Sequence, residues 1–296
     1  MTINQALVAA TKKIKNKKIK TASLDAEVLL AFILKKLKEY LYTCPQKELS
    51  KKQIASFKNL ISRRIKNEPI AYLTKNKEFF GLNFYVDRRA LIPRPETELL
   101  VEEVINRIKN QELRIKNQSL TIADIGAGCG CIAITLAKIL PTICNKRFAI
   151  SYYATDISKS ALLIAKKNAK KHQTKVKFFQ GDLLKPLKNK SIDVVVANLP
   201  YGWQQWKNNT LAENRGLKFE PPKAIFTKEK GLYLYRRLFQ QITKRKQKPR
   251  FILGEFDPRQ KKYLQKITKE QFPQYQLKIK KDLASLNRIF VLAVKG

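Results

Sequence analysis

The feature that most constrains the fold of this chain is a short apolar segment that runs directly into a glycine-rich turn. Residues 120–125 read Leu-Thr-Ile-Ala-Asp-Ile, and glycines then occupy positions 126, 128 and 130. An apolar stretch of helical character follows from about residue 131 to 140. Glycines allow a ligand to approach the backbone closely. A buried strand, a glycine turn and a helix in this order are typical of α/β folds that hold a nucleotide-like cofactor at the turn.

The rest of the chain after residue 93 alternates strand and helix patterns. Repeated units of this kind predict an α/β fold with a largely parallel sheet covered by helices on both faces. The last two strands have no helix between them, so we expect them to pair in antiparallel fashion. Strands are predicted near 120–125, 149–155, 176–180, 192–197, 250–255, 276–280 and 289–295, and helices near 131–140, 159–172, 231–244 and 258–271.

The N-terminal part of the chain has a different character. Apolar residues recur at helical spacing in 24–34 and 54–65, and Ser23 is a plausible N-cap for the first of these helices. No glycine occurs before Gly81, around which aromatic and polar residues alternate as in a hairpin. We therefore expect a helical bundle over 1–75, a linking hairpin over 76–92 and the α/β domain over 93–296.

The chain is strongly basic, with 61 Lys and Arg against 23 Asp and Glu and a net charge of +38. Residues 1–75 hold 17 of the basic and 5 of the acidic residues, so both parts of the chain are basic. Such a balance attracts nucleic acid and other polyanions. Two interpretations stay open: a surface selected to contact RNA or the ribosome non-specifically, and a compositional drift towards Lys.

Several classes of protein are disfavoured by composition. The four cysteines and the single histidine show no zinc-ligand spacing, so no metal site is expected. Cys129 and Cys131 are interpreted as small residues of the glycine turn. Without a disulfide framework, a reducing cytoplasm is the expected location. The apolar run at 28–34 is too short to span a membrane, and no signal-peptide cleavage site follows it, so no membrane association is expected.

Three acidic residues follow three successive strands of the predicted sheet. Asp124 lies just before the glycine turn, Asp156 ends the second strand, and Asp182 follows the third. Carboxyl ends of parallel strands meet at one edge, so the three acids are expected to line one crevice. Asp124 suits an amino group, Asp156 can accept ribose hydroxyls, and Asp182 with Leu183 can bind adenine. The G-x-G-x-G spacing differs from the pattern that binds pyrophosphate cofactors. This difference favours S-adenosylmethionine as the cofactor, with S-adenosylhomocysteine as its product.

The fourth strand delivers Asn198-Leu199-Pro200-Tyr201 to the same edge. An amide or a base amine is a weak nucleophile because its lone pair is delocalised, so a site for it needs hydrogen-bond acceptors rather than a strong base. The side-chain oxygen of Asn198 and a backbone carbonyl of Leu199 or Pro200 can hold an N–H and orient the lone pair. Pro200 restricts the backbone, and Tyr201 packs on the planar group. The segment predicts methyl transfer to a planar nitrogen, with Asn198, Pro200 and Tyr201 as the catalytic residues.

The tetrapeptide resembles the N-P-P-Y motif of amino and amide methyltransferases. Longer stretches resemble the release-factor glutamine methyltransferases, the PrmC/HemK family, and the resemblance covers nearly the whole chain. The last of these stretches is the most specific, because N-P-P-Y is shared with DNA and RNA methylases. The stretches are Leu24–Leu30, Glu68–Leu73, Glu78–Gly81 and Leu91–Glu98.

The resemblance implies a seven-stranded, Rossmann-like class I methyltransferase sheet and a helical N-terminal domain that contacts the release factor. It implies methyl transfer from S-adenosylmethionine to the glutamine side-chain nitrogen in the Gly-Gly-Gln loop of class I peptide chain release factors. The implied cofactor residues are Asp124, Ile125, Gly126, Ala127, Gly128, Asp156, Leu183 and Asn198, to which the strand-end pattern adds Asp182. The implied substrate residues are Asn198, Leu199, Pro200 and Tyr201, and Arg94 and Glu96 are also predicted to bind the substrate.

The chain departs from the family pattern at several positions. Leu199 replaces the first proline of the tetrapeptide, 220–224 lacks an arginine after Glu-Pro, Cys129 stands where Thr is commoner, and 282–288 lacks a glycine. Two alternatives stay open beside the glutamine methyltransferase. One is an enzyme that methylates an adenine or other base amine of RNA or DNA, and the other is a catalytically silent RNA-binding module.

Overall fold

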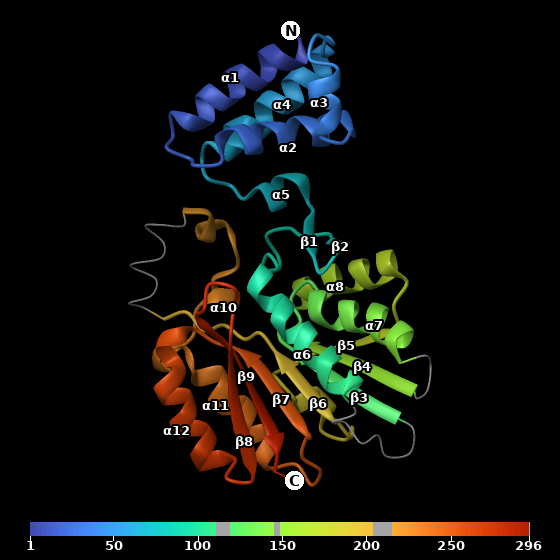
Figure 1. Ribbon diagram of the computed structural model, residues 1–296, viewed down its shortest axis with the longest axis vertical. Coiled ribbons are helices and arrows are strands. Elements are labelled where there is room, and N and C mark those ends of the chain that lie inside the picture. The colour runs from blue at the N-terminus through green and yellow to red at the C-terminus, as the bar shows by residue number, and fades with distance from the viewer. Residues whose placement is uncertain (111–118, 145–148, 204–214, 296) are drawn as a thin grey trace. The chain divides into compact units, whose positions relative to one another are not determined.

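The computed structural model describes residues 1–110, 119–144, 149–203 and 215–295 (Figure 1). The chain forms two compact units. The first consists of residues 1–76 with a short segment that ends at Phe219, and the second holds the remainder from Lys77 onward. Within the described residues, no helix is long and apolar enough to cross a membrane.

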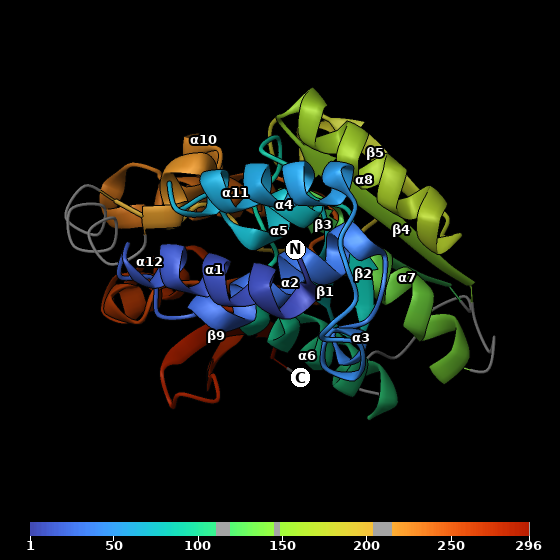
Figure 2. The ribbon, with the colours of Figure 1, turned by 90° about the horizontal axis from the view of Figure 1, so that it is seen from above.

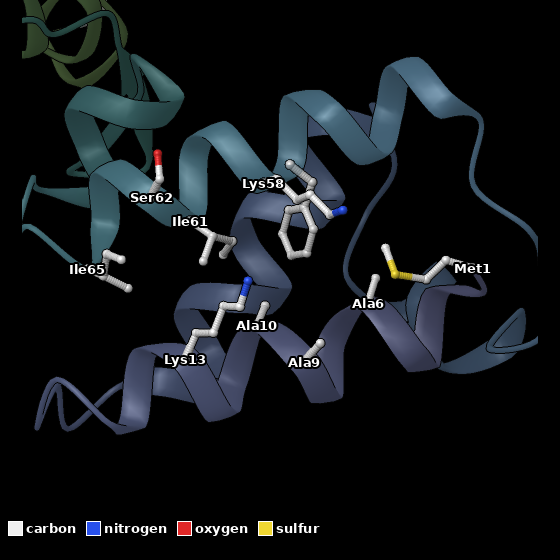
Figure 3. Close-up of a pocket in the computed structure, with 10 residues that line it drawn as sticks. Met1, Ala6, Ala9, Ala10, Lys13, Lys58, Ile61, Ser62 and Ile65 are labelled. Atoms are coloured by element: carbon white, nitrogen blue, oxygen red, sulfur yellow. The ribbon is translucent and has the colours of Figure 1, made fainter.

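The first unit is a bundle of helices, as its apolar periodicity predicts. Figure 2 shows its long helices α1, α2 and α4 packed beside one another. A shallow hollow of about 120 Å³ lies between α1 and α4, lined by small and apolar side chains such as Ala6, Ala10 and Ile61 (Figure 3). The helices of the unit are α1 (Ile3–Lys15), α2 (Ala22–Leu34), α3 (Glu39–Thr43), α4 (Lys51–Arg64) and α5 (Ile70–Thr74).

The prediction that Ser23 caps the second helix is wrong. The helix begins at Ala22, two residues earlier than a cap at Ser23 requires, and the N-cap residue Thr21 forms no side-chain cap with the described residues. Ser23 therefore lies within the first turn, where its hydroxyl donates to Glu27 (2.9 Å). Caps of the expected kind occur instead at Thr2 and Ser50, whose hydroxyls accept the backbone N–H three residues later.

Buried ion pairs join the helices of this bundle. The carboxylate of Asp25 in α2 accepts from Nε of Arg64 in α4 (2.7 Å), and Arg64 also donates to the backbone carbonyl of Glu68 (3.2 Å). Arg63 binds the Glu68 carboxylate through two hydrogen bonds (2.9 and 2.7 Å). Both acids are almost fully buried, so they need these partners to offset the loss of hydration. Asp25 and Glu68 lie in two of the stretches that resemble the PrmC/HemK family.

The predicted hairpin around Gly81 is present but short. It consists of β1 (Lys77–Phe79) and β2 (Leu82–Phe84), which pair in antiparallel fashion. Phe80 and Gly81 both have positive φ (52° and 71°), as tight two-residue hairpin turns require. The buried rings of Phe79 and Phe84 pack edge to face with centroids 6.1 Å apart.

Seven strands form the sheet of the second unit (Figure 1). They are β3 (Ser119–Ile125), β4 (Ala149–Asp156), β5 (Val176–Gln180), β6 (Val194–Ala197), β7 (Phe251–Glu255), β8 (Tyr275–Lys281) and β9 (Asn287–Val294). Their order is β5-β4-β3-β6-β7-β9-β8, with β3 to β7 parallel and β9 antiparallel to both of its neighbours. The mostly parallel sheet with a terminal antiparallel hairpin is confirmed.

Helices cover both faces of this sheet. One face carries α6 (Glu98–Lys109), α7 (Cys131–Ile143) and α8 (Lys159–His172), and the other carries α11 (Tyr233–Thr243) and α12 (Lys261–Gln271). The core beneath α11 and α12 is aromatic, and a side chain on Gly254 of β7 would collide with the ring of Phe290. Short helical segments lie at Pro95–Thr97, Lys185–Leu187, Arg215–Phe219, Pro222–Ile225, Glu229–Gly231 and Pro258–Gln260.

A buried amide joins the segment after the hairpin to the glycine turn. The side chain of Asn168 in α8 accepts from the N–H of Tyr85 (2.8 Å) and donates to the carbonyls of Tyr85 and Cys129 (2.9 Å each). Asn168 is fully buried, so these groups are not in contact with bulk water. The glycine turn between β3 and α7 is thus also held in place by a side chain of α8.

We expect Asn168→Ala to destabilise the protein by about 3 kcal/mol, because the substitution leaves buried N–H and C=O groups without partners. Urea unfolding followed by circular dichroism measures the loss. Asn106→Ala is the matched control, since Asn106 is exposed on α6 and should change stability by less than about 0.5 kcal/mol. Equal stabilities for the two variants would contradict the proposed role of the Asn168 bonds.

Candidate active site

The glycine turn after β3 has the open backbone that its sequence predicts. Gly126 and Gly128 adopt positive φ (80° and 56°), a region that favours glycine. The N–H groups of Gly126 and Ala127 donate to the carbonyl of Thr155 in β4 (2.8 and 2.9 Å), which holds the turn against the neighbouring strand. A Cβ on Gly128 would meet no atom of the described residues within 4 Å. The turn therefore leaves space beside its backbone for a ligand.

Asp124 lies beneath this turn, on the sheet face that α7 covers. It is 1% exposed, and one carboxyl oxygen accepts the N–H of Ala133 (3.1 Å). The other oxygen, Oδ1, is buried and has no hydrogen-bond partner among the described residues. Burial raises the pKa of Asp124 to about 7, and the charge of Asp156 acts in the same direction. An unused buried acceptor of this kind suits a donor supplied by a ligand.

Asp156 ends β4 and supports the turn directly. Its two oxygens accept the N–H of Gly128 and of Ser158 (2.8 Å each), and burial raises its pKa. Ser158, not Asp156, caps α8 through its hydroxyl, which accepts from Ala161 (3.2 Å). Each carboxylate oxygen has a second lone pair for a further donor. The side chain of Ile157, next along the chain, is 69% exposed.

Asp182 and Leu183 follow β5 at the same edge of the sheet. Asp182 is paired with Arg237 of α11 (2.5 Å) and with Lys185 (3.0 Å), both through Oδ2. Leu183 has a positive φ of 52°, and its carbonyl accepts from the hydroxyl of Thr155 (2.8 Å). The three acids predicted to share one crevice do follow three neighbouring strands. The ion pair with Arg237 was not predicted.

Asn198 follows β6, which pairs with β3 so that Ala197 lies opposite Ile125. Its Nδ2 donates to the hydroxyl of Thr97 (2.9 Å) and to the carboxylate of Glu255 (3.0 Å). No donor from the described residues bonds to its Oδ1. The amide oxygen is thus available to an N–H of a substrate.

Leu199, the departure from the N-P-P-Y motif, is 3% exposed and belongs to the hydrophobic core. Its Cδ2 lies 3.0 Å from the position that a Cβ on Gly126 would take. Leu199 and Gly126 therefore fit together, and a larger residue at either position would disturb the other. The substitution of leucine for proline is accommodated by the core beneath the glycine turn.

Tyr201 is held at both its hydroxyl and its backbone. The hydroxyl donates to Glu255 Oε1 (2.9 Å), and the carbonyl accepts from Nε2 of Gln260 (2.9 Å). Gly231 (φ 84°) packs so closely that any Cβ there would collide with the Tyr201 carbonyl. Burial, with the nearby charge of Glu255, raises the pKa of Tyr201 well above its usual value, so Tyr201 stays a hydrogen-bond donor.

Glu255 is the main residue of this site that the sequence interpretation missed. It ends β7, is 1% exposed, and accepts from Thr97, Asn198 and Tyr201. Burial raises its pKa, while the hydrogen bonds from Thr97 and Tyr201 and the charge of Arg288 lower it. An acid at a predicted strand end was a usable signal, since the same signal marked Asp156.

Arg94 and Glu96, the predicted substrate residues before α6, have different surroundings. Arg94 forms an ion pair with the buried carboxylate of Glu220 (2.5 Å), which also accepts the N–H of Ile92 (3.0 Å). Glu96 is exposed, and its charge acts on Glu255. Among the described residues, no group of three or more His, Cys, Asp or Glu is arranged to hold a metal ion.

Solved structures share this fold. The N-terminal domain of human METTL16 in complex with SAH is 15% identical, covers 90% of this chain and 94% of its own, and has a TM-score of 0.54. A class I S-adenosylmethionine-dependent methyltransferase from Listeria monocytogenes, described as putative, is 13% identical over 99% of this chain and 89% of its own, with a TM-score of 0.51. At these identities the likeness concerns the fold alone.

Sequence comparisons are more specific. Residues 5–74 match the family described as PrmC N-terminal domain, and residues 97–215 match the methyltransferase small domain. The release factor glutamine methyltransferase of Koribacter versatilis is 36% identical over 82% of this chain and 81% of the relative. The Bacillus cereus enzyme of the same name is 32% identical over 89% of both chains. The chain therefore belongs to the family of release factor glutamine methyltransferases.

Proposed function

We propose that this chain transfers the methyl group of S-adenosylmethionine to the side-chain amide nitrogen of the glutamine in the Gly-Gly-Gln motif of class I peptide chain release factors. The observation that carries the proposal is the state of Asn198, whose amide nitrogen donates within the protein, to Thr97 and to Glu255. Its oxygen is left as an acceptor next to an open glycine turn. Relatives that are more than 30% identical to this chain over the aligned residues are named for this reaction, which favours glutamine as the acceptor.

The residues around the glycine turn suit the cofactor. We assign the unpaired oxygen of Asp124 to its amino group and the open side of residues 125–128 to its methionine portion. Asp156 has lone pairs for the ribose hydroxyls. Oδ1 of Asp182, which has no partner among the described residues, is our candidate for the adenine amino group, with Leu183 against the ring. When bound, the cofactor supplies an electrophilic methyl group on a sulfonium.

The tetrapeptide prepares the acceptor. We propose that Asn198 Oδ1 and a carbonyl of Leu199 or Pro200 accept the two N–H bonds of the glutamine amide. This arrangement turns the nitrogen lone pair out of conjugation and towards the methyl group. Tyr201 packs on the planar amide. The N–C bond forms as the S–C bond breaks, and the extra proton then leaves the nitrogen for water, so no general base is needed.

The other parts of the chain have roles in this proposal. Residues 1–75 form the release-factor-binding domain, 76–92 the link, and 93–296 the catalytic domain, and we assign Arg94 and Glu96 to substrate binding. The net charge of +38 favours an additional non-specific contact with RNA or the ribosome. We place the reaction in the cytoplasm, where release factors act.

Incubation with a release factor and methyl-labelled cofactor should label the peptide that contains the Gly-Gly-Gln motif. A release factor with Ala in place of that Gln is the control and should stay unlabelled. Label on RNA or DNA in place of protein would favour the base-amine alternative. Absence of cofactor binding in calorimetry would favour the silent RNA-binding module.

Asn198→Ala should lower kcat by about 100-fold or more, because the variant loses a hydrogen-bond acceptor that orients the nucleophile. Single-turnover methylation of the release factor measures the effect. Asn106→Ala, an exposed asparagine on α6, should keep the wild-type rate. A kcat for Asn198→Ala within threefold of wild type would refute the role of Asn198.

Affinity for S-adenosylmethionine should rise with pH up to about 7 and then level off. The pKa of Asp124 is raised to about 7 in the folded protein, so the carboxyl is protonated below that pH, whereas a cationic amino group favours the carboxylate. Binding near pH 6 should therefore release a proton. Calorimetry in buffers of different ionisation enthalpy measures the release, and Asp124→Asn should abolish it.

The raised pKa of Asp124 also predicts how the stability of the cofactor-free protein changes with pH. Because the folded-state pKa of Asp124 is raised above the unfolded value, its contribution to stability is fully present below pH about 4 and is lost as pH rises towards 7. Asp156, whose pKa is also raised, acts in the same direction, so Asp156→Asn is the comparison. A pH profile unchanged by Asp124→Asn would contradict the assignment.

A further inference from the structure

We propose that Glu255 is the positioning residue of the acceptor site: with Thr97 it fixes the amide of Asn198 so that the oxygen faces the substrate nitrogen, and it orients Tyr201 at the same time. The inference rests on the proposed methyl transfer to a planar nitrogen. One carboxylate, that of Glu255, thus orients both Asn198 and Tyr201, the two side chains that contact the acceptor in the proposed reaction.

The direction of the hydrogen bonds around Asn198 favours one of the two orientations of its side-chain amide. Thr97 Oγ1 donates its single proton to Glu255 Oε2 (2.6 Å), so towards Asn198 it presents a lone pair. Nδ2 of Asn198 donates to that lone pair (2.9 Å) and to the same Oε2 (3.0 Å). A reversed amide would place its oxygen against a carboxylate and a hydroxyl lone pair, and both contacts would be repulsive.

Removal of the Glu255 carboxylate abolishes the preference for one orientation of the Asn198 amide. Without an acceptor at Oε2, the hydroxyl of Thr97 is free to rotate and to donate to the Asn198 oxygen instead. The amide then loses its preference between the two orientations, and in the reversed one its oxygen is occupied. Asn198 alone is therefore insufficient for the site, because a primary amide presents nearly the same shape in both orientations.

The second oxygen of Glu255 acts on the other end of the tetrapeptide. Oε1 accepts the hydroxyl proton of Tyr201 (2.9 Å), which sets the direction of the aromatic ring. Neighbouring parallel strands bring these groups together, since Ala197 of β6 lies opposite Gly254 of β7. Asn198 and Glu255 are thus adjacent residues at the carboxyl edge. Arg288, held by Asp282 (2.9 Å), adds a positive charge that favours the carboxylate form of Glu255.

Negative charge at this position has an electronic consequence as well. A hydrogen bond from an amide N–H to a carboxylate polarises the amide and increases the negative charge on its oxygen. Asn198 therefore becomes a stronger acceptor for the substrate N–H. The negative charge of Glu255 also stabilises the positive charge that develops on the substrate nitrogen as the methyl group arrives. Both effects act in the transition state, so they should appear in kcat.

Apart from Asn198, the predicted cofactor-binding residues are not part of this arrangement. Glu255 and Thr97 form no hydrogen bond with the glycine turn, with Asp124 or with Asp156 among the described residues. Loss of either side chain should consequently leave cofactor affinity nearly unchanged. This separation distinguishes a positioning role at the acceptor from a general structural one.

The arrangement also accounts for the stretch Leu91–Glu98, which the sequence marks as the most family-like. Thr97, at the end of a short helical segment, is the residue of that stretch that reaches Asn198. It is 2% exposed although it is polar, so its position serves the hydrogen bonds rather than solvation. A hydroxyl in this place is needed both as donor and as acceptor.

The test compares Glu255→Gln, Thr97→Val and Thr97→Ser in single-turnover methylation. We expect Glu255→Gln and Thr97→Val to lower kcat about 10- to 100-fold, the size of effect that misplacement of a reacting group produces. KM for the release factor and the dissociation constant of the cofactor should stay within threefold. Thr97→Ser keeps the hydroxyl and should stay within threefold of the wild-type kcat.

Two control variants remove similar groups elsewhere. Glu103→Gln changes a buried carboxylate that pairs with Arg107 on α6, and Thr135→Val removes a buried hydroxyl that has no hydrogen-bond partner in the described part of the chain. Both should keep the wild-type kcat. If Glu255→Gln fails to fold, the difference between Thr97→Val and Thr97→Ser carries the test.

A second readout does not depend on the acceptor. In ¹⁵N-labelled protein, the side-chain amide protons of Asn198, assigned by their loss in Asn198→Ala, should be shifted downfield and exchange slowly. Both properties should be lost in Glu255→Gln and kept in Thr97→Ser. If the wild type labels no release factor but these signals behave as described, the proposed function fails and the positioning role stands.

Three results would overturn the inference. The first is a wild-type kcat in both Glu255→Gln and Thr97→Val. The second is a cofactor affinity that falls in step with kcat, since that would indicate a structural effect on the whole site. The third is an Asn198 amide signal that does not change when the carboxylate is removed.

Discussion

The pairing of β3 with β6 is the constraint on which the candidate site depends. The chain adds β4 and β5 on one side of β3 and then returns to place β6 on the other side, so the sheet order reverses between β3 and β6. The two strands end together, with Ile125 opposite Ala197. The glycine turn and Asn198 therefore leave the sheet side by side, and Leu199 packs into the space that Gly126 leaves. A cofactor turn and an acceptor-binding segment become neighbours because two parallel strands share one edge.

The buried carboxyl groups at this edge of the sheet have two different roles. Asp124 and Glu255 are both 1% exposed, so each loses the hydration that stabilises a carboxylate. Glu255 regains that stabilisation from three donors inside the protein, which makes it part of a finished arrangement. One oxygen of Asp124 has no such donor in the described structure. The difference separates a group that organises the protein from a group that is left for a ligand.

Much of the architecture was predictable because its signals are local. The strand and helix order, the terminal antiparallel pair, the helical N-terminal part and the short hairpin all follow from the spacing of apolar residues and from turn residues such as Gly81. Predictions failed where a boundary depends on how the chain enters an element. Ser23 has the chemistry of an N-cap, but α2 begins at Ala22, so the residue lies inside the helix.

The sequence by itself determined the strand ends and the residues that follow them, and hence the acids, the glycine turn and the tetrapeptide. Only the tertiary structure decided how these residues are held. Thr97 meets Asn198 across 101 residues and Glu255 across 158, and Arg94 meets Glu220 across 126. Contacts at such separations leave no periodic or spacing pattern in a single sequence. Their geometry comes from the order and register of the strands, which set the neighbours of each strand end.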